Sequence, residues 1–302
     1  MKHSLKITAL LISMFLVAQL IGIYVANAYL PETKQVLNEE TGELESKKIY
    51  DLPYGLDPPE DIEPQTSAIS IIIAIFIAVG LMFLLMRLKA ESFIRIWFFI
   101  VVSLGIALAL NAIVPLPNPA IISLLLAVPL AALKVFQRNI IVHNLTELLI
   151  YPGIASVFIP LLSVPTVVFL LIVISIYDMY AVWHAGFMQT MAKYQIEKVK
   201  IFSGFFIPYI GRKERQKLNK LTKPKKVQVH LAILGGGDVV FPILLSGVVL
   251  ATLGILPAIM IALGATVALT FLFIMSEKGK FYPAMPFIST GCIIALIIAY
   301  FI

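Results

Sequence analysis

Apolar runs of about 20 residues follow one another along most of the chain, and they limit its possible folds more than any other feature. An α-helix needs a run of this length to cross the hydrocarbon core of a bilayer. The runs are unbroken rather than alternating, so they favour helices over the strands of a transmembrane barrel. We therefore predict an all-α polytopic membrane protein with about nine transmembrane helices. The candidate spans are Ile7–Ala28, Ser67–Met86, Ile96–Val114, Pro119–Leu133, Asn144–Leu162, Val167–Ala192, Val229–Leu250, Leu256–Ile274 and Pro283–Ile302.

The composition agrees with a membrane protein. Charged residues make up 13% of the chain, whereas soluble domains average about 25%. The single cysteine, Cys292, lies in the last apolar run, so a disulfide framework and a cysteine-based metal site are excluded. Lys2, Lys6 and the small residues Ala26 and Ala28 also fit a signal peptide around the first run. That run is longer than the ~7–15 apolar residues of a signal peptide, which favours a retained helix.

The distribution of basic residues predicts the orientation. If the N-terminus is cytoplasmic and nine spans alternate, 20 of the 23 Lys and Arg residues fall on the inner side. The first outer loop carries ten of the 17 acidic residues. The positive-inside rule then places the C-terminus outside. The net charge of +6 is explained by this topology, and we expect no nucleic-acid partner.

The same pattern divides the chain into three parts. Residues 1–192 contain six spans and an acidic outer loop at 29–66, residues 193–228 form a basic cytoplasmic linker, and residues 229–302 contain the last three spans. We expect the linker to be a solvated tether. Its apolar stretch IFSGFFIPYIG is also suited to lying on the membrane surface or to plugging a cavity.

Two aspartates, Asp178 and Asp238, lie inside apolar runs on consecutive spans. A carboxylate in hydrocarbon costs at least ~2.5 kcal/mol, so retained intramembrane acids are candidates for a functional role. If both runs are helical throughout, the two acids lie roughly 22 and 18 Å from Lys193 and Lys226, and hence at one depth. Two carboxyls in a low dielectric share one proton. The ionised partner can then take a proton from water while the protonated one polarises a carbonyl, as in aspartic proteases.

Three neighbouring features fit such a site. The glycines Gly235–Gly237 directly precede Asp238, where they weaken a helix in mid-span by ~1 kcal/mol each and permit close backbone approach. Tyr177 precedes Asp178 and is either a partner of a carboxyl or an ordinary packed aromatic. The segment Pro283–Met285 is either a loop before a helix start or a rigid non-helical segment that faces the acids.

In combination, these residues resemble a known family. Tyr177-Asp178, Gly235-Gly236-Gly237-Asp238 and Pro283-Ala284-Met285 are similar to the YD, GxGD and PAL motifs of intramembrane aspartyl proteases, which include presenilin and signal peptide peptidase. The motifs come in the family's order and on the matching spans. The one departure is Met285 in place of leucine, a nearly volume-conserving change. The cytoplasmic N-terminus resembles presenilin, and the short linker resembles a microbial, archaeal-type homologue.

The resemblance implies hydrolysis of peptide bonds in transmembrane substrates by two aspartates and a water, with no cofactor and no metal. The substrate helix must first become extended, and we expect a backbone edge near Gly235–Gly237 or near Pro283–Met285 to hold it as an added strand. The resemblance implies a catalytic pair, Asp178 and Asp238, and residues that shape the site or contact substrate, namely Tyr177, Gly235, Gly236, Gly237, Pro283, Ala284 and Met285.

The resemblance also bears on partners and location. The lipid bilayer is the expected environment, which is the cell membrane if the source is prokaryotic. Accessory subunits are not expected to be required, and homo-oligomers stay open. We expect water to reach the aspartates from the cytoplasmic side.

Other functions fit the same residues. A proton-coupled transporter or ion channel would use the intramembrane aspartates as a relay. A prepilin-type peptidase also carries GxGD, but usually with a lysine soon after the aspartate, where Val239-Val240-Phe241 stands here. The acids would otherwise be structural groups bonded across helices. His143 and Glu147, one helical turn apart, resemble half a metal site, but no further ligands lie nearby in sequence.

Overall fold

The computed structural model describes residues 5–37, 44–58, 64–114, 118–137, 139–185, 201–210, 229–277 and 282–301. Nine long helices are found in these residues: α1 (Leu5–Ala28), α2 (Pro64–Arg87), α3 (Glu91–Ile113), α4 (Pro119–Phe136), α5 (Ile140–Phe158), α6 (Val164–Tyr180), α9 (Gly236–Leu253), α10 (Ile255–Met275) and α11 (Met285–Tyr300). Two antiparallel hairpins pair β1 (Glu32–Leu37) with β2 (Leu44–Ile49), and β3 (Gly204–Ile210) with β4 (Val229–Gly235). Short helical turns are η1 (Pro53–Gly55), η2 (Ile159–Leu161) and the π-helical η3 (Ala181–Ala185).

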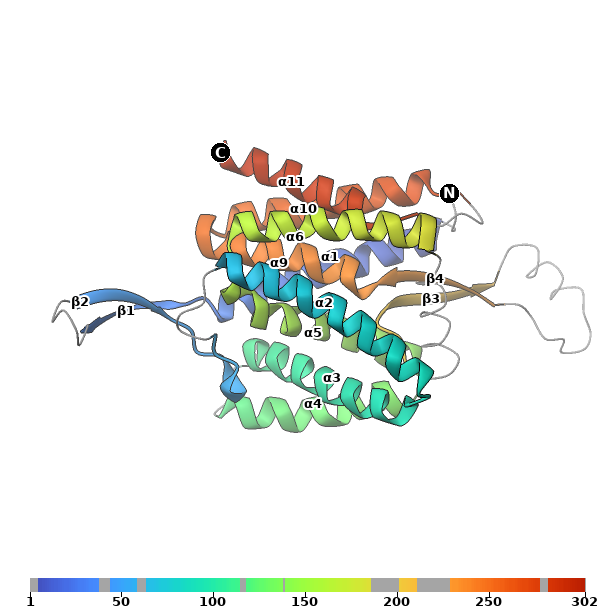
Figure 1. The fold of residues 1–302 in the computed structure, drawn as a ribbon, viewed down its shortest axis with the longest axis horizontal. Coiled ribbons are helices and arrows are strands. Elements are labelled where there is room, and N and C mark those ends of the chain that lie inside the picture. Colours follow the sequence, from blue (N-terminus) through green and yellow to red (C-terminus); the bar gives the residue numbers. More distant parts are fainter. Residues whose placement is uncertain are drawn as a thin grey trace, which may run out of the picture.

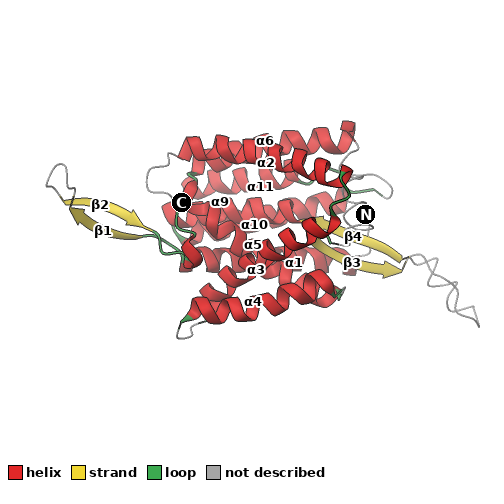
Figure 2. Ribbon diagram, turned by 60° about the horizontal axis from the view of Figure 1, so that its bottom comes forward, coloured by secondary structure: helices red, strands yellow, loops and turns green. Residues whose placement is uncertain are grey.

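The helices form a single bundle with one hairpin at each end (Figures 1 and 2). The first residues of α1 lie at the β3–β4 end, and α11 ends at the β1–β2 end. This is the arrangement that an odd number of crossings requires. Which end faces the cytoplasm stays a prediction from the charge distribution.

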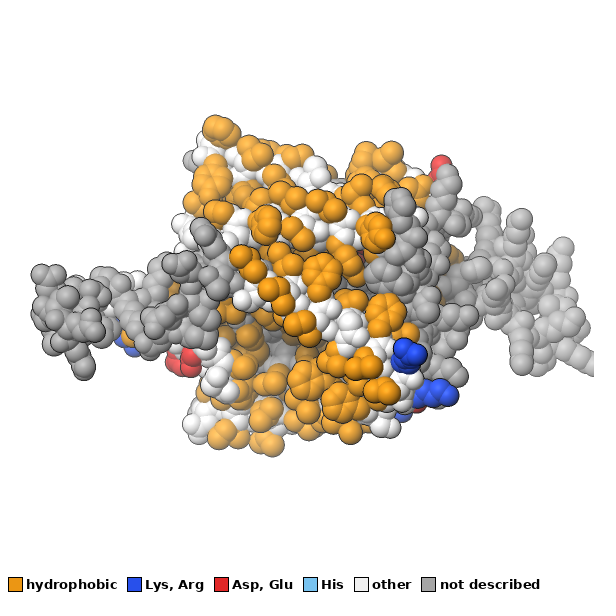
Figure 3. Space-filling view, in the orientation of Figure 1, with side chains coloured by type: hydrophobic (Ala, Val, Ile, Leu, Met, Phe, Trp, Pro, Cys, Tyr) orange, Lys and Arg blue, Asp and Glu red, His pale blue; other side chains and the backbone are white. Residues whose placement is uncertain are grey.

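The prediction of an all-α polytopic membrane fold is confirmed. In the described part of the chain, eight helices are long and apolar enough to cross a membrane, and α11 is a shorter apolar helix of 16 residues. Apolar side chains cover the face of the bundle seen in Figure 3, as expected where lipid replaces water. The helix α1 packs against α5, α9 and α10, and its Leu11, Phe15 and Ala18 are fully buried, so it is an integral part of the bundle.

Small residues and caps explain how the helices pack and where they begin. Gly105 of α3 lies against Gly153 of α5, and Gly264 of α10 lies against Gly291 of α11, so these backbones approach closely. The helix α6 begins with a capping box in which Ser163 and Thr166 each accept from the other's backbone N–H. Close contacts between glycines therefore bring α3 against α5 and α10 against α11.

The seventh predicted span is wrong at its start, because Val229–Gly235 forms strand β4 and the helix begins only at Gly236. Along β4 the exposed Leu231 and Ile233 alternate with the buried Ala232 and Leu234, which is the period of a strand. The glycines therefore start a helix instead of interrupting one. The estimate that counted helical residues from Lys226 to Asp238 fails for the same reason.

The linker prediction also needs a correction. The apolar stretch that was expected in a solvated tether forms β3 at Gly204–Ile210 and pairs with β4 along its whole length. The remaining parts of the linker, 193–200 and 211–228, lie outside the described residues. At the other end of the bundle, part of the outer loop forms the β1–β2 hairpin, and Tyr29 is held there by a hydrogen bond to Leu108 O at 2.8 Å.

Candidate active site

Three helix ends meet at the two intramembrane aspartates. Asp178 lies in the last turn of α6, Asp238 in the first turn of α9, and Met285 is the first residue of α11. The helix α6 packs against both α9 and α11, and α9 also packs against α11. The structure thus brings together the three motifs that are separated by up to about a hundred residues in sequence.

The Asp178 carboxylate is held by the start of α11. Its Oδ2 accepts a hydrogen bond from the Met285 backbone N–H at 3.1 Å, and the Ala284 backbone also bonds to it. The first N–H groups of a helix have no partner within the helix, and the helix dipole favours negative charge there. The side chain is 9% exposed, so these backbone donors replace most of its water.

The Asp238 carboxyl lies at the N-terminus of its own helix. A Cβ on Gly235, the residue that caps α9, would be 3.2 Å from Asp238 Oδ2, so the carboxyl folds back against the backbone of the cap. Each carboxyl is therefore placed at a helix N-terminus, Asp178 at the start of α11 and Asp238 in the first turn of α9.

The segment Pro283–Met285 is both a turn before a helix start and a segment that faces Asp178, the two alternatives that the sequence left open. Pro283 is non-helical and buried, and Ala284 is the N-cap of α11. The helix then begins at Met285 with Pro286 in its first turn, where a missing N–H does no harm. The non-helical part is what turns the Ala284 and Met285 backbone toward Asp178.

Tyr177 is packed as an aromatic side chain. Its ring meets Phe76 of α2 edge to face, with the ring centroids 6.2 Å apart and an interplanar angle of 87°. It thereby connects α6 to α2 directly beside Asp178. Phe76 was not singled out from the sequence.

Two serines near the site also escaped sequence reasoning. Ser175, one turn before Asp178, donates to Ser289 Oγ at 2.9 Å, and Ser289 lies one turn after Met285. The Ser175–Ser289 hydrogen bond connects α6 to α11 one helical turn away from Asp178. Their spacing of three and four residues from the motifs was the available signal, because such neighbours share a helix face.

Gln19 is a further missed residue. It is fully buried in α1, and its amide donates to Val239 O at 3.0 Å. This bond holds the first turn of α9 directly after Asp238. A glutamine in the middle of an apolar run was the sequence signal, since buried polar groups in a membrane need partners.

The three glycines differ in how much room surrounds them. A Cβ on Gly236 would be 2.9 Å from Ser203 Oγ and 2.9 Å from the Tyr151 hydroxyl, whereas a Cβ on Gly237 would meet only Phe241 at 3.9 Å. Tyr151 is itself fully buried and cannot move away freely. Close packing at this helix start therefore depends on Gly236.

We expect Gly236→Ala to lower the free energy of unfolding by ~1–3 kcal/mol through overpacking. Gly237→Ala should leave it unchanged or raise it by up to ~1 kcal/mol, because alanine is the better helix former. Thermal unfolding of both variants in the same detergent measures the difference. Equal melting temperatures would contradict the close packing at Gly236.

His143 and Glu147 do lie together, but with a lysine. Lys134 of α4 donates to Glu147 Oε1 and to His143 Nδ1, and all three side chains are buried. The Lys134 ammonium group thus lies between His143 and Glu147, where a metal ion bound by these two side chains would lie. In the part of the chain that the structure describes, no three His, Cys, Asp or Glu side chains gather as metal ligands.

Comparisons with known proteins identify a family and a fold. The family model described as signal-peptide peptidase, presenilin aspartyl protease matches residues 55–302. The chain has no match among curated proteins. Its fold is similar to the structure of a presenilin family intramembrane aspartate protease in a C222 crystal form, with a TM-score of 0.58, 20% identity, and 97% of this chain and 98% of that chain covered. A P2 crystal form gives a TM-score of 0.58 and 20% identity, with 96% of each chain covered.

Proposed function

Since the chain belongs to the signal-peptide peptidase, presenilin aspartyl protease family, we propose that Asp178 and Asp238 are the catalytic pair of a GxGD-type intramembrane endopeptidase. The protein is an integral, multi-pass membrane protein of an aspartyl protease family. The observation that carries the proposal is the meeting of both acids at the ends of α6, α9 and α11.

The proposed mechanism needs only the two carboxyls and one water. The ionised carboxyl takes a proton from the water as its oxygen bonds to the scissile carbonyl carbon, while the protonated carboxyl donates to the carbonyl oxygen. The resulting diol collapses when a proton passes to the amide nitrogen and the C–N bond breaks. The products are a carboxylic acid and an amine, and the pair again holds one proton.

The backbone at the end of β3–β4 suits an extended substrate. The N–H and C=O groups of Leu231, Ile233 and Gly235 point away from β3, because the groups of neighbouring residues alternate in an antiparallel pair. In the described residues this sheet has only two strands, so β4 has an open edge that leads to Asp238. A substrate strand added there would expose its carbonyls, which a transmembrane helix keeps bonded internally.

We further propose transmembrane-helix proteins as substrates, the cell membrane as the location, and activity without accessory subunits. The positive-inside pattern, with the β3–β4 end of the bundle at the cytoplasm, supports access of water from that side. The site lies toward that end, since α6 ends and α9 and α11 begin there.

The test is cleavage of a single-span peptide by the full chain purified in detergent, with and without an aspartyl-protease transition-state analogue. We expect cleavage that the analogue blocks and that inhibitors of serine proteases leave unchanged. An uncleaved set of peptides, together with proton flux through the protein in liposomes, would instead support a channel or transporter.

A further inference from the structure

The helix α5 forms hydrogen bonds along the outer edge of β3 through its side chains. The Asn144 amide donates to Phe206 O at 2.9 Å and accepts from Phe206 N at 3.1 Å. One turn along α5, Glu147 Oε1 accepts from Gly204 N at 3.3 Å, and His143 Nε2 lies 2.8 Å from Gly204 O. These three side chains, which we call the α5 clamp, therefore bind both backbone groups of two alternate residues, as a third strand would.

Proline at position 208 fits this arrangement. The outward-facing residues of β3 alternate, so Pro208 follows Gly204 and Phe206 on the clamped edge. Proline has no N–H to donate, so it leaves no unpaired donor beyond the reach of the clamp. The edge of β3 is thus satisfied along the part that lies against the bundle.

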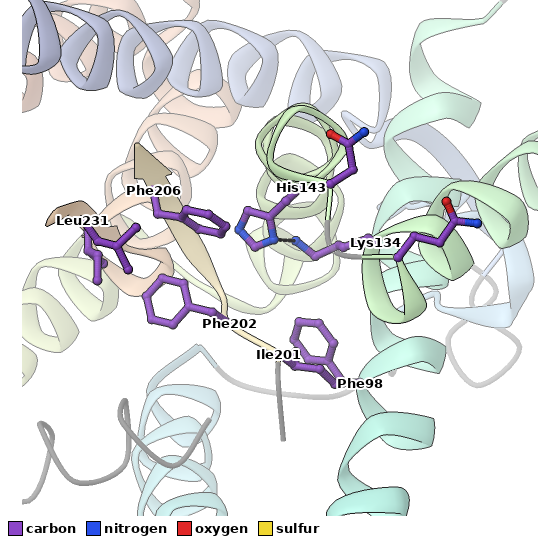
Figure 4. Close-up of a pocket in the computed structure, with 10 residues that line it drawn as sticks. Phe98, Lys134, His143, Ile201, Phe202, Phe206 and Leu231 are labelled. Atoms are coloured by element: carbon purple, nitrogen blue, oxygen red, sulfur yellow. Dashed lines mark hydrogen bonds between the residues drawn. The ribbon is translucent and has the colours of Figure 1, made fainter. Parts of the chain in front are cut away.

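A buried lysine fixes the clamp itself. Lys134 donates to Glu147 Oε1 and to His143 Nδ1, and its side chain and that of Glu147 are almost completely buried. An ammonium group has only donors, so Nδ1 of His143 must accept and Nε2 carries the hydrogen that is donated to Gly204 O. Figure 4 shows His143 between Lys134 of α4 and Phe206 of β3. The ring of His143 also packs on Phe206, with centroids 4.4 Å apart.

Side-chain packing holds only one face of the hairpin tightly. Phe205 and Leu234 are buried, and Phe205 meets Tyr151 of α5 edge to face. The other face opens onto a pocket of about 230 Å³, whose lining includes Phe202, Leu231 and Ile233. The hairpin therefore has free space on one side, and hydrogen bonds to α5 are needed to fix it along its edge.

We propose that Asn144, Glu147 and His143 are positioning residues that set the direction of the Asp238 carboxyl through the β3–β4 hairpin. Gly204, which the clamp holds at both backbone groups, pairs with Gly235. Gly235 is the cap of α9, and Asp238 follows three residues later in the first turn. The α5 clamp is thus connected to the Asp238 carboxyl through the Gly204–Gly235 pair and the N-cap of α9. The proposal rests on the catalytic role of Asp238 proposed above.

The diagnostic variant is Asn144→Leu, which removes both hydrogen bonds to Phe206 and leaves the buried Lys134–Glu147 pair intact. Hydrogen–deuterium exchange of the peptide that contains 201–210 should become at least ~10-fold faster, because Phe206 loses its partner on that edge. A misplacement of about 1 Å at a reacting group costs on the order of 10²-fold in rate. We therefore expect kcat for a single-span peptide to fall by ~10- to 100-fold, also at saturating substrate.

Tyr29→Phe is the matched control. It also removes two hydrogen bonds, to Leu108 O and from Asn111, but at the β1–β2 end of the bundle. This variant should keep both kcat and the exchange of 201–210 unchanged. His143→Phe is a second test variant, because phenylalanine retains the packing on Phe206 and loses only the polar contacts.

The outcomes separate the two proposals. Unchanged exchange in Asn144→Leu, or faster exchange with an unchanged kcat, would overturn the positioning role while the protease function stands. A wild-type chain that cleaves no substrate would overturn the proposed function and the positioning role with it. Faster exchange together with a lower kcat, at a melting temperature equal to that of Tyr29→Phe, supports the proposal.

Discussion

Asp178→Asn and Asp238→Asn should each reduce the rate of peptide cleavage by ~10⁴-fold or more, which is the loss seen when a residue of a catalytic unit is removed. The amide has the shape of the carboxyl but can neither take a proton from water nor deliver one. Its oxygen can still accept from the Met285 N–H that binds Asp178, so the junction of α6 and α11 is kept. Initial rates on a single-span peptide, with product identified by mass spectrometry, measure the effect.

Glu91→Gln is the control for this pair of variants. Glu91 lies in the first turn of α3, a helix that packs against α1, α2, α4 and α5, and the variant makes the same carboxyl-to-amide change. It should cleave at the wild-type rate. Full activity in either aspartate variant, with the protein folded, would show that the two carboxyls do not act as a unit.

Lys134→Met should lower the free energy of unfolding by ~3–5 kcal/mol, the cost of leaving one member of a buried ion pair without its partner. The Lys134 and Glu147 side chains are 1% and 0% exposed, so water cannot compensate for the loss. The double variant Lys134→Met with Glu147→Gln should recover most of the stability, because no charge is then buried and the amide oxygen can still accept from Gly204 N. Chemical unfolding in mixed micelles measures all four members of the cycle.

The cycle distinguishes a coupled pair from two independent residues. Residues in direct contact give interaction energies that single variants do not predict, whereas independent sites add. If the double variant is as unstable as the sum of the two single variants, the buried pair is not coupled as the structure indicates.

The sequence predicted most of the spans because they depend on local signals, whereas the place of Pro283–Met285 beside the acids came from the family resemblance. A helix that crosses a bilayer must be apolar over about 20 residues. The end of one span and the start of the next therefore lie on the same side of the bilayer. Asp178 and Asp238 stood out because few other charges lie in apolar runs. The order of the motifs then indicated which helix ends come together.

The strand β4 was missed because both of its faces are apolar, so its alternation of buried and exposed residues does not appear in the sequence. Leu231 and Ile233 face the pocket while Ala232 and Leu234 face the bundle, but all four are apolar, so no alternation of polar and apolar residues marks the strand. The partner strand lies before a segment of 18 residues, 211–228. Pairing at that distance leaves no local pattern.

The contacts of Lys134 and Asn144 were missed for a different reason. Lys134 was assigned to the inner loops as one of many basic residues, and nothing in the sequence showed that it pairs with Glu147, 13 residues later. Asn144 binds the backbone N–H and C=O of Phe206, and these groups do not depend on the residue type. A hydrogen bond to a backbone group therefore cannot be predicted from the pattern of side chains in the sequence.

The helices α9 and α11 are short, and α11 has a consequence for the surrounding lipid. With 18 and 16 residues they rise about 27 and 24 Å, less than the ~30 Å hydrocarbon core, while α1 with 24 residues rises about 36 Å. Such hydrophobic mismatch is relieved by local thinning of the bilayer. Thinning on this side brings the headgroup boundary nearer to the two aspartates, and lipids with longer acyl chains would oppose it. Under the proposed access of water from this side, the thickness of the host membrane affects how easily water reaches the two aspartates.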